Sequence, residues 1–345
     1  MHRGLTTATL AACLAAFACA PARPPVLVIT VEGLPAGVLG NLQSSVPGLR
    51  RLAKRARVFP RAFAASQEGT ASLACLATGR HVADHGVRGP GDVADAAVPT
   101  LGDLLVKEGY VAAASVPQAA AGSVRGFRPL GSGSMPESIQ ALASSTTLPW
   151  AAWVHIAPPV GLEEERGVQW IDAEVGALIH GLDLLGLLDR SVVILVGCGD
   201  AATMSDRDMA IPLCVRLPGG GLGNGNLDRL ASTVDILPTV LGAVGASLPP
   251  GLPGVDLASP AERRPVDGVA AHGRNGAAAV WLATAQLVHD TQAGAWRLTE
   301  TGADGTVRRE VKERDARAPV ELWQFLEDFE TGGWRTLPGG RAEGQ

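Results

Sequence analysis

Uninterrupted apolar runs alternate with segments of helical periodicity, and this alternation limits the folds open to the chain. Residues 26–31 read Val-Leu-Val-Ile-Thr-Val, and similar runs follow at 111–116, 150–156, 191–196 and 212–217. Because a strand that is apolar along its whole length has both faces covered, these runs predict a mostly parallel sheet. Helices that would cover both faces of that sheet are expected at 49–57, 70–77, 101–108, 168–188 and 232–244.

The pattern changes near residue 265, where shorter strands are expected at 277–289 and 295–300, followed by a Gly- and Asp-containing turn. We therefore predict a small antiparallel subdomain packed on an α/β core. The predicted organisation is a signal at 1–19, a core at 26–262, a C-terminal α+β subdomain at 263–335 and a tail at 336–345.

Composition excludes two classes of protein. Hydrophobic residues make up 46% of the chain and charged residues 18%, which excludes a wholly disordered chain. The formal net charge is −5 and no cluster of Lys and Arg is long enough to hold a phosphate backbone, so nucleic acid is not expected as a partner.

The N-terminus has the order of an export signal. A basic start, Met1-His2-Arg3, is followed by an apolar run at 4–18 that is too short to span a membrane. Cys13 and Cys19 each lie in a sequence that resembles a bacterial lipobox; the residue pattern favours Cys13 and the length of the apolar run favours Cys19. We expect a lipid-anchored protein in the periplasm or on the outer surface, with a plain cleaved signal as the alternative.

Three cysteines follow the signal. Their odd number and wide spacing fit neither a disulfide framework nor a zinc site, so they are expected to be small buried apolar residues: Cys75, Cys198 and Cys214.

Several stretches carry family-like motifs in a fixed order. Residues 46–53 read Val-Pro-Gly-Leu-Arg-Arg-Leu-Ala, residues 76–87 include Thr-Gly-Arg and His-Gly-Val, and residues 234–240 read Val-Asp-Ile-Leu-Pro-Thr-Val. Together with the strand at 26–31, they resemble sulfatases and other hydrolases of the alkaline phosphatase superfamily. The resemblance extends from residue 26 to about 330 and implies an alkaline-phosphatase-like α/β fold.

The resemblance also locates a nucleophile, and there the sequence departs from the family pattern. The family's nucleophile lies ten residues before the Gly of Thr-Gly-Arg, at a helix N-terminus that favours an anion. Counting back from Gly79 gives Gly69, which has no side chain, and the neighbouring Pro and Arg of the motif become Ala71 and Leu73. Thr70 is the nearest hydroxyl; it is a candidate nucleophile, or a residue at or near the helix cap.

The metal ligands that the resemblance implies are also altered. The first acidic pair is replaced by Glu32-Gly33, which keeps one carboxylate on a longer side chain. The later Asp-His pair aligns with Cys198 and Gly199, while a two-residue shift would bring Asp200 into that position. Glu32 and Asp200 are therefore the candidate ligands, for Ca²⁺ or Zn²⁺ if the protein is active; otherwise no cofactor is expected.

Three further residues are near the implied site. His155 lies in the strand at 150–156 and is either a buried hydrogen-bonded residue or an acid. Arg80 and His85 belong to the Thr-Gly-Arg stretch and are interpreted mainly as structural ties around the nucleophile helix.

Two functions remain open. The joint loss of the nucleophile, its Arg, the second carboxylate and the Asp-His pair predicts an inactive sulfatase-like protein of the cell envelope that binds an unidentified small molecule or protein, since each loss alone costs orders of magnitude in rate. The alternative is a divergent metal-dependent hydrolase or transferase acting on sulfate or phosphate esters. It would use Thr70 or Ser66 as nucleophile, with carboxylates drawn from Glu32, Asp84, Asp172, Asp200 and Asp235.

Overall fold

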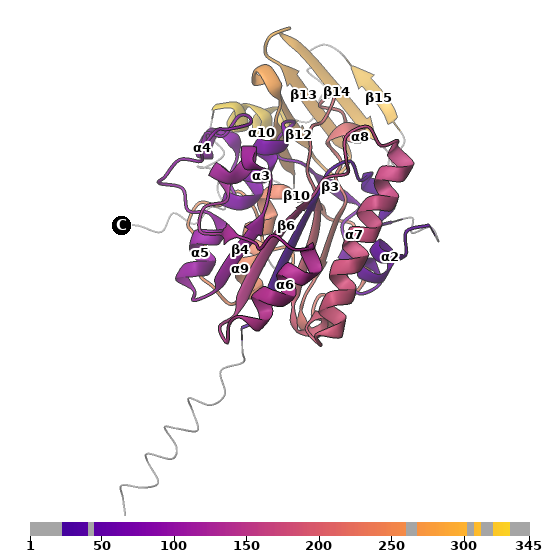
Figure 1. The fold of residues 1–345 in the computed structure, drawn as a ribbon. Helices are drawn as coiled ribbons and strands as arrows, with labels where there is room; N and C mark the ends of the chain where they lie inside the picture. Colours follow the sequence, from indigo (N-terminus) through magenta and orange to yellow (C-terminus); the bar gives the residue numbers. More distant parts are fainter. Residues whose placement is uncertain (1–22, 41–44, 260–267, 302–306, 312–319, 332–345) are drawn as a thin grey trace, which may run out of the picture.

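The computed structural model describes residues 23–40, 45–259, 268–301, 307–311 and 320–331 (Figure 1). The predicted signal with Cys13 and Cys19, the tail at 336–345 and the predicted boundary between core and subdomain at 262–263 lie outside these ranges. None of the described helices combines the length and the apolar character that crossing a membrane requires.

An eight-stranded sheet forms the core, in the order β5-β4-β6-β1-β7-β8-β2-β9. The fully buried β1 (Val26–Val31) lies at its centre and pairs in parallel with β6 (Trp150–Ile156) and β7 (Val192–Gly197). On the β6 side, β4 (Val111–Ser115) and β5 (Arg128–Pro129) continue the parallel arrangement. On the other side, β8 (Leu213–Arg216) is antiparallel to both β7 and β2 (Arg57–Val58), and β9 (Gly225–Asn226) forms the edge. The expected mostly parallel sheet is confirmed.

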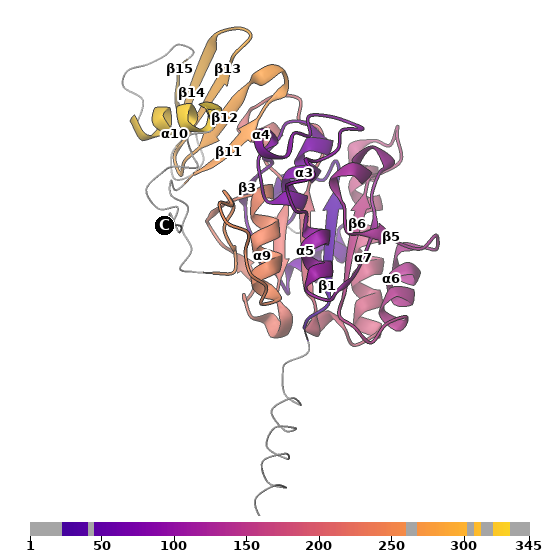
Figure 2. The same cartoon turned by 90° about the vertical axis from the view of Figure 1, so that its left-hand side faces the viewer.

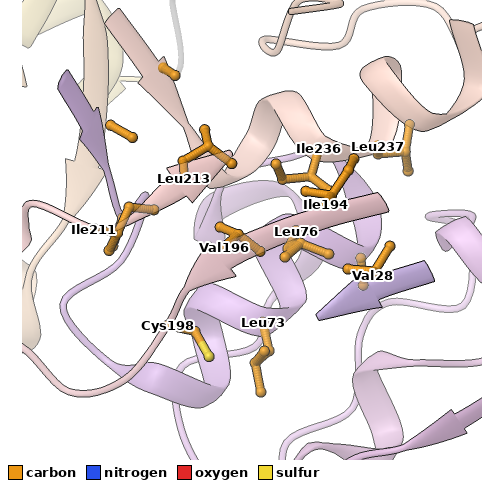
Figure 3. Packing of buried hydrophobic residues seen from close by; sticks show 14 of the residues in the cluster. Val28, Leu73, Leu76, Ile194, Val196, Cys198, Ile211, Leu213, Ile236 and Leu237 are labelled. Atoms are coloured by element: carbon orange, nitrogen blue, oxygen red, sulfur yellow. The ribbon is translucent and has the colours of Figure 1, made fainter. Parts of the chain in front are cut away.

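Helices cover both faces of this sheet, as the apolar strands required (Figure 2). Alternate residues of β1 contact opposite layers: Val26 and Val28 belong to the cluster under α3 (Gly69–Thr78), α5 (Leu101–Lys107) and α9 (Ile236–Ala243). Figure 3 shows part of this cluster, in which Val28 and Ile194 of the sheet pack with Leu76 of α3. Leu27 and Ile29 contact the other layer, formed by α2 (Pro47–Ala53), α6 (Met135–Ser144) and α7 (Glu164–Leu184).

Three helices differ by more than one residue from the sequence prediction. The helix expected at 232–244 is a 3-10 helix, η5 (Thr233–Asp235), followed directly by α9. The helix expected at 49–57 is α2, which begins at Pro47 and ends at Ala53 because Pro at its first position favours initiation and the chain must enter β2 at Arg57. The helix expected at 168–188 is α7, which begins earlier, at Glu164; Glu164 and Glu165 in its first turn complement the helix dipole.

Shorter elements connect the core. A two-stranded parallel sheet pairs β3 (Arg61–Phe63) with β10 (Leu230–Ser232). The remaining short helices are η1 (Ala36–Val38), α4 (Val82–His85), η2 (Gln118–Ser123), η3 (Leu188–Arg190), α8 (Asp206–Met209), η4 (Pro218–Gly220), η5 (Thr233–Asp235) and η6 (Arg274–Gly276).

A separate five-stranded antiparallel sheet follows the core, as predicted, and lies above it in Figure 1. Its strands are β11 (Val269–His272), β12 (Ala278–Trp281), β13 (Ala285–Asp290), β14 (Ala295–Thr301) and β15 (Val307–Val311), with α10 (Val320–Thr331) packed on it. The single strand expected at 277–289 is wrong: residues 282–284 form a turn between β12 and β13. The sheet packs on the core, where the rings of Trp281 and Phe63 stack at 4.8 Å.

Candidate functional site

The carboxyl ends of the central strands meet the N-terminus of α3, and this is where several candidate residues come together. Glu32 follows β1, His155 is the penultimate residue of β6, and the 198–200 segment follows β7. Gly69 is the first residue of α3 and contacts that segment. Ligands of open parallel sheets bind at this edge, so the position itself suits a functional site.

Glu32 has a partner in the core. Its Oε1 lies 3.1 Å from His155 Nε2, although this contact lacks the alignment of a hydrogen bond. The His155 side chain is only 3% exposed, whereas that of Glu32 is 42% exposed. The Glu32 carboxylate therefore lies at the rim of the sheet edge, beside the ring it contacts.

A polar network holds the His155 ring from the other side. His155 Nδ1 lies 3.1 Å from the Thr30 hydroxyl, which also accepts a hydrogen bond of 3.0 Å from Trp153 Nε1. The Thr30 hydroxyl lies against Nδ1, on one side of the ring, while Nε2 on the other side lies toward Glu32. The arrangement thus orients His155 toward Glu32 from residues of two adjacent strands.

Cys198 directly follows β7 and lies beside this network. Its backbone N–H donates to the Val31 carbonyl at 2.8 Å, and its sulfur lies 3.7 Å from His155 Nδ1. Burial, together with the negative charge of Glu32, raises the pKa of the Cys198 thiol, so the thiol is protonated at neutral pH. The expectation of small buried cysteines holds here and for Cys75 and Cys214.

The aligned nucleophile position has little room for a side chain. A Cβ on Gly69 would lie 3.1 Å from the Cα of Gly199 and 3.4 Å from the N of Asp200. Gly199 has φ +138°, a conformation that favours glycine, and a Cβ on it would in turn lie 3.7 Å from Glu32 Cγ. Gly69 thus lets the segment after β7 approach the start of α3 closely, and Gly199 supplies the backbone conformation of that segment.

The chain's own carboxylates occupy the N-terminus of α3. The Gly69 N–H donates to Asp200 Oδ1 at 2.9 Å, and the Ala71 N–H donates to Glu68 Oε2 at 2.6 Å. Glu68 is the N-cap residue, and the other oxygen of Asp200 lies 3.0 Å from Arg274 Nη2. Because the Gly69 and Ala71 N–H groups already bind carboxylates, a sulfate or phosphate bound through them would have to displace these side chains against like charge.

Gln67 ties the same region to the C-terminal sheet. Its side-chain amide donates to the carbonyls of Ala201 and Ala202 at 3.2 Å each, and its side-chain oxygen accepts from the Arg274 N–H at 2.9 Å. The Ala201 N–H also donates to the Gln67 carbonyl at 2.9 Å. The loop after β7 is therefore fixed against α3 from both sides.

Neither hydroxyl candidate is positioned like an activated nucleophile. Thr70 is the second residue of α3 rather than its cap and is half-buried, and its hydroxyl makes no hydrogen bond to the part of the chain that the structure describes. Ser66 is 3% exposed, and its oxygen accepts from the Glu68 N–H at 3.2 Å. Neither lies within hydrogen-bond distance of a described side chain that could serve as a base.

Arg80 and His85 lie apart from this edge and act as ties. The Arg80 guanidinium donates to the carbonyls of Pro250 and Gly251 at 2.8 and 3.0 Å. His85 is fully buried; its Nδ1 accepts from the Val87 N–H and its Nε2 lies 3.3 Å from the Cys75 sulfur. Burial lowers the His85 pKa to about 4, so the ring is neutral at pH 7.

The other carboxylate candidates do not join Glu32 and Asp200. Asp172 accepts from the N–H groups of Gly48 and Leu49 at the start of α2, and Asp235 accepts from those of Ser232 and Val255. Asp84 lies in α4. Among the described residues, no three His, Cys, Asp or Glu side chains group as a metal site requires. The donor set at the sheet edge therefore does not fit the divalent cation that the family resemblance implies.

Sequence reasoning missed Gln67 and Arg274, which complete this region. Arg274 lies in η6, more than 200 residues after Gln67, and no motif or spacing links the two positions. Only the fold shows that β11 runs beside the segment before α3, where Ser66 and His272 form a β-bridge.

Comparison with known proteins identifies the fold. No protein-family model and no curated protein matches the chain. Among solved structures, a phosphonate monoester hydrolase from Silicibacter pomeroyi is similar with a TM-score of 0.73 and 16% identity, over 92% of this chain and 97% of that one. A 2-O glycosaminoglycan (GAG) sulfatase gives 0.75 and 16%, over 92% and 94%. A protein of the alkaline phosphatase superfamily from Vibrio parahaemolyticus gives 0.67 and 16%, over 92% and 88%. The chain therefore has the sulfatase-like fold of the alkaline phosphatase superfamily.

Proposed function

We propose that this protein is a non-catalytic member of its fold class that binds a small molecule or a protein partner. The observation that carries the proposal is the occupation of the α3 N-terminus. There Asp200 binds the Gly69 N–H, Glu68 binds the Ala71 N–H, and Gly69 itself carries no nucleophile. Ester hydrolysis at this position needs an anionic group where two carboxylates already lie.

The described residues provide no complete set of ligands for the cation that would offset this charge. Glu32 contacts His155, and Asp200 is held by Gly69 and Arg274. A divalent cation prefers several oxygen ligands around one point. Among the described residues, neither Glu32 nor Asp200 belongs to a group of three or more His, Cys, Asp or Glu side chains that could hold a metal ion. We therefore propose that the protein does not hydrolyse sulfate or phosphate esters.

The proposal places the protein in the cell envelope. Its support is the sequence of residues 1–19, in which one lipidation candidate, Cys13, lies within the apolar run and the other, Cys19, directly follows it. A lipid anchor would hold the protein at a membrane in the periplasm or on the outer surface. Mass spectrometry of the mature N-terminus would distinguish a lipidated Cys13, a lipidated Cys19 and a plain cleaved end.

Ester turnover tests the non-catalytic assignment. The purified chain is incubated with aryl esters of sulfate and phosphate and with a phosphonate monoester, each with added Ca²⁺, Zn²⁺ or Mn²⁺. We expect no turnover above that of a Glu32→Ala, Thr70→Ala double variant. Turnover that the double variant lacks would refute the proposal and support the alternative, a divergent metal-dependent hydrolase or transferase.

A further inference from the structure

A pocket lies between the core and the C-terminal sheet, on the side of α3 that leads to α4. Its volume is about 270 Å³. The walls include Ser66, Glu68, Val82, Arg88, His272 and Arg274. The backbone joins the two parts beneath it, because the His272 N–H donates to the Ala65 carbonyl and the His272 carbonyl accepts from the Gln67 N–H. The pocket is therefore built into the junction and does not depend on a free loop.

Arg88 supplies a positive charge that no carboxylate of the described residues pairs with. Its side chain is exposed and forms no ion pair or hydrogen bond within the described residues. The neighbouring Arg274 differs, since it is paired with Asp200 at 3.0 Å. Glu68 is the acidic residue of the wall, and its Oε2 is engaged by the Ala71 N–H. Among the described residues, the Arg88 guanidinium of the pocket therefore has no ion-pair partner, whereas the Glu68 carboxylate is hydrogen-bonded by the Ala71 N–H.

His272 connects this charge to the junction. Its ring packs against Phe329, with centroids 4.3 Å apart, and its Nε2 is buried without a hydrogen-bond partner among the described residues. Burial and then the positive charge of Arg88 lower the His272 pKa to about 4, so the ring is neutral at pH 7. A neutral ring adds no charge to the wall, which leaves Arg88 as the group that selects a ligand.

The chemistry of the walls defines the ligand class. A guanidinium binds planar or tetrahedral oxyanions through charge-assisted hydrogen bonds. The side chains of Ala71 and Val82 give the pocket an apolar surface. A volume of about 270 Å³ is at the small end for ligand sites.

We propose that this junction pocket binds a small organic oxyanion, a carboxylate or a phosphate, with Arg88 as its principal partner. The inference rests on the binding role proposed above and gives it a ligand class. The pocket adjoins the α3 N-terminus through Ser66, Glu68 and Arg274, but Glu32 and His155 do not line it. Binding there requires neither a metal nor a nucleophile.

Calorimetric titration of the purified full chain with inorganic phosphate, and separately with acetate, tests the proposal. We expect saturable one-to-one binding of at least one of the two anions, and which one binds identifies the class. Arg88→Gln should weaken that binding at least tenfold, because it removes a charge-assisted hydrogen bond. Arg88→Lys should lie between the wild type and Arg88→Gln, because it keeps the charge but loses the fork of donors.

Two further variants make the titration specific. Arg50→Gln is the matched control, because Arg50 is exposed on α2, outside the pocket, and forms no ion pair within the described residues. It should leave binding unchanged. Glu68→Gln removes a negative charge from the wall and should tighten binding. Absence of binding by both anions, or equal binding by Arg88→Gln and the wild type, would overturn the inference.

Failure of this inference is separable from failure of the proposed function. If the protein shows no ester turnover and binds neither anion, the proposed junction site is wrong and the non-catalytic assignment stands. Ester turnover lost in the Glu32→Ala, Thr70→Ala double variant would instead contradict the non-catalytic assignment, whatever Arg88 does.

Discussion

Replacing Gly69 by Ala should destabilise the protein, although Gly to Ala inside a helix usually stabilises. The new Cβ would lie 3.1 Å from the Cα of Gly199 and 3.2 Å from its carbonyl carbon. The optimum separation of two carbon atoms is about 3.5–4.0 Å, so backbone must move to relieve the overlap. That backbone is held, because Cys198 N–H donates to Val31 and Ala201 N–H donates to Gln67.

The magnitude follows from two opposing effects. Inserting a methyl group into a packed site costs typically ~1–3 kcal/mol. Restricting the unfolded chain by replacing Gly with Ala contributes about 0.4–1 kcal/mol in the other direction. We therefore expect a net loss of about 1 kcal/mol in the free energy of unfolding of the Gly69→Ala variant.

Urea denaturation followed by circular dichroism measures this loss, with Gly181→Ala as the matched control. Gly181 lies within α7, and the nearest heavy atom to its added Cβ is Pro136 Cβ, at an ordinary contact distance of 3.6 Å. The control should gain about 0.5–1 kcal/mol relative to glycine. If Gly69→Ala is stabilised as much as Gly181→Ala, the start of α3 has room for a side chain and our description of a closed nucleophile position is wrong.

Three further predictions test the surroundings of the site. The His85 pKa is lowered from 6.5 to about 4, so between those values the unfolded chain binds a proton that the folded chain does not. Its contribution to stability is therefore fully present above pH 6.5 and falls by about 2 kcal/mol from pH 7 to pH 5, and the lowered pKa of His272 adds a similar fall. Urea denaturation should show a fall of about 4 kcal/mol in the wild type and about half of that in a His85→Gln variant. Asp200→Ala should lower the free energy of unfolding by about 1 kcal/mol, because the Gly69 N–H loses its acceptor. Asp200→Asn keeps an oxygen at that position and should lower the free energy of unfolding by less. Equal decreases in the two variants would exclude that hydrogen bond as the cause. Burial raises the pKa of three thiols, those of Cys75, Cys198 and Cys214. A thiol reagent at pH 8 should therefore leave them unlabelled in the folded protein and label them fully in denaturant. Rapid labelling of any one of them in the folded protein would contradict its burial.

The sheet could be predicted from sequence because a strand that is buried on both faces is apolar at nearly every position. The run at 26–31 has no polar position except Thr30, and it became the central strand β1. Helix ends were less accurate, because α2 is limited by its proline start and by the short strand that follows, not by its own periodicity. The turn at 282–284 was missed for a related reason: apolar residues on both sides of it hide the break between β12 and β13.

The site was predictable only where one motif fixed it. Counting from Gly79 led to Gly69 at the start of α3, and the strand ends led to Glu32 and Asp200. The sequence did not show that Asp200 binds the Gly69 N–H or that Arg274 reaches Asp200 from the C-terminal sheet. Those contacts depend on how two sheets pack, and this information is spread over the whole chain.

Bound metal per chain tests the central claim most directly, because it requires no choice of substrate. The protein is purified without chelator, dialysed in turn against Ca²⁺, Zn²⁺ and Mn²⁺, and analysed by elemental mass spectrometry beside a Glu32→Ala variant. Asp200 is held by Gly69 and Arg274, and the described residues contain no group of three or more His, Cys, Asp or Glu side chains around one point. We therefore predict far less than one metal ion per chain and no difference between the two proteins. Near-stoichiometric metal that is lost in Glu32→Ala would contradict the account.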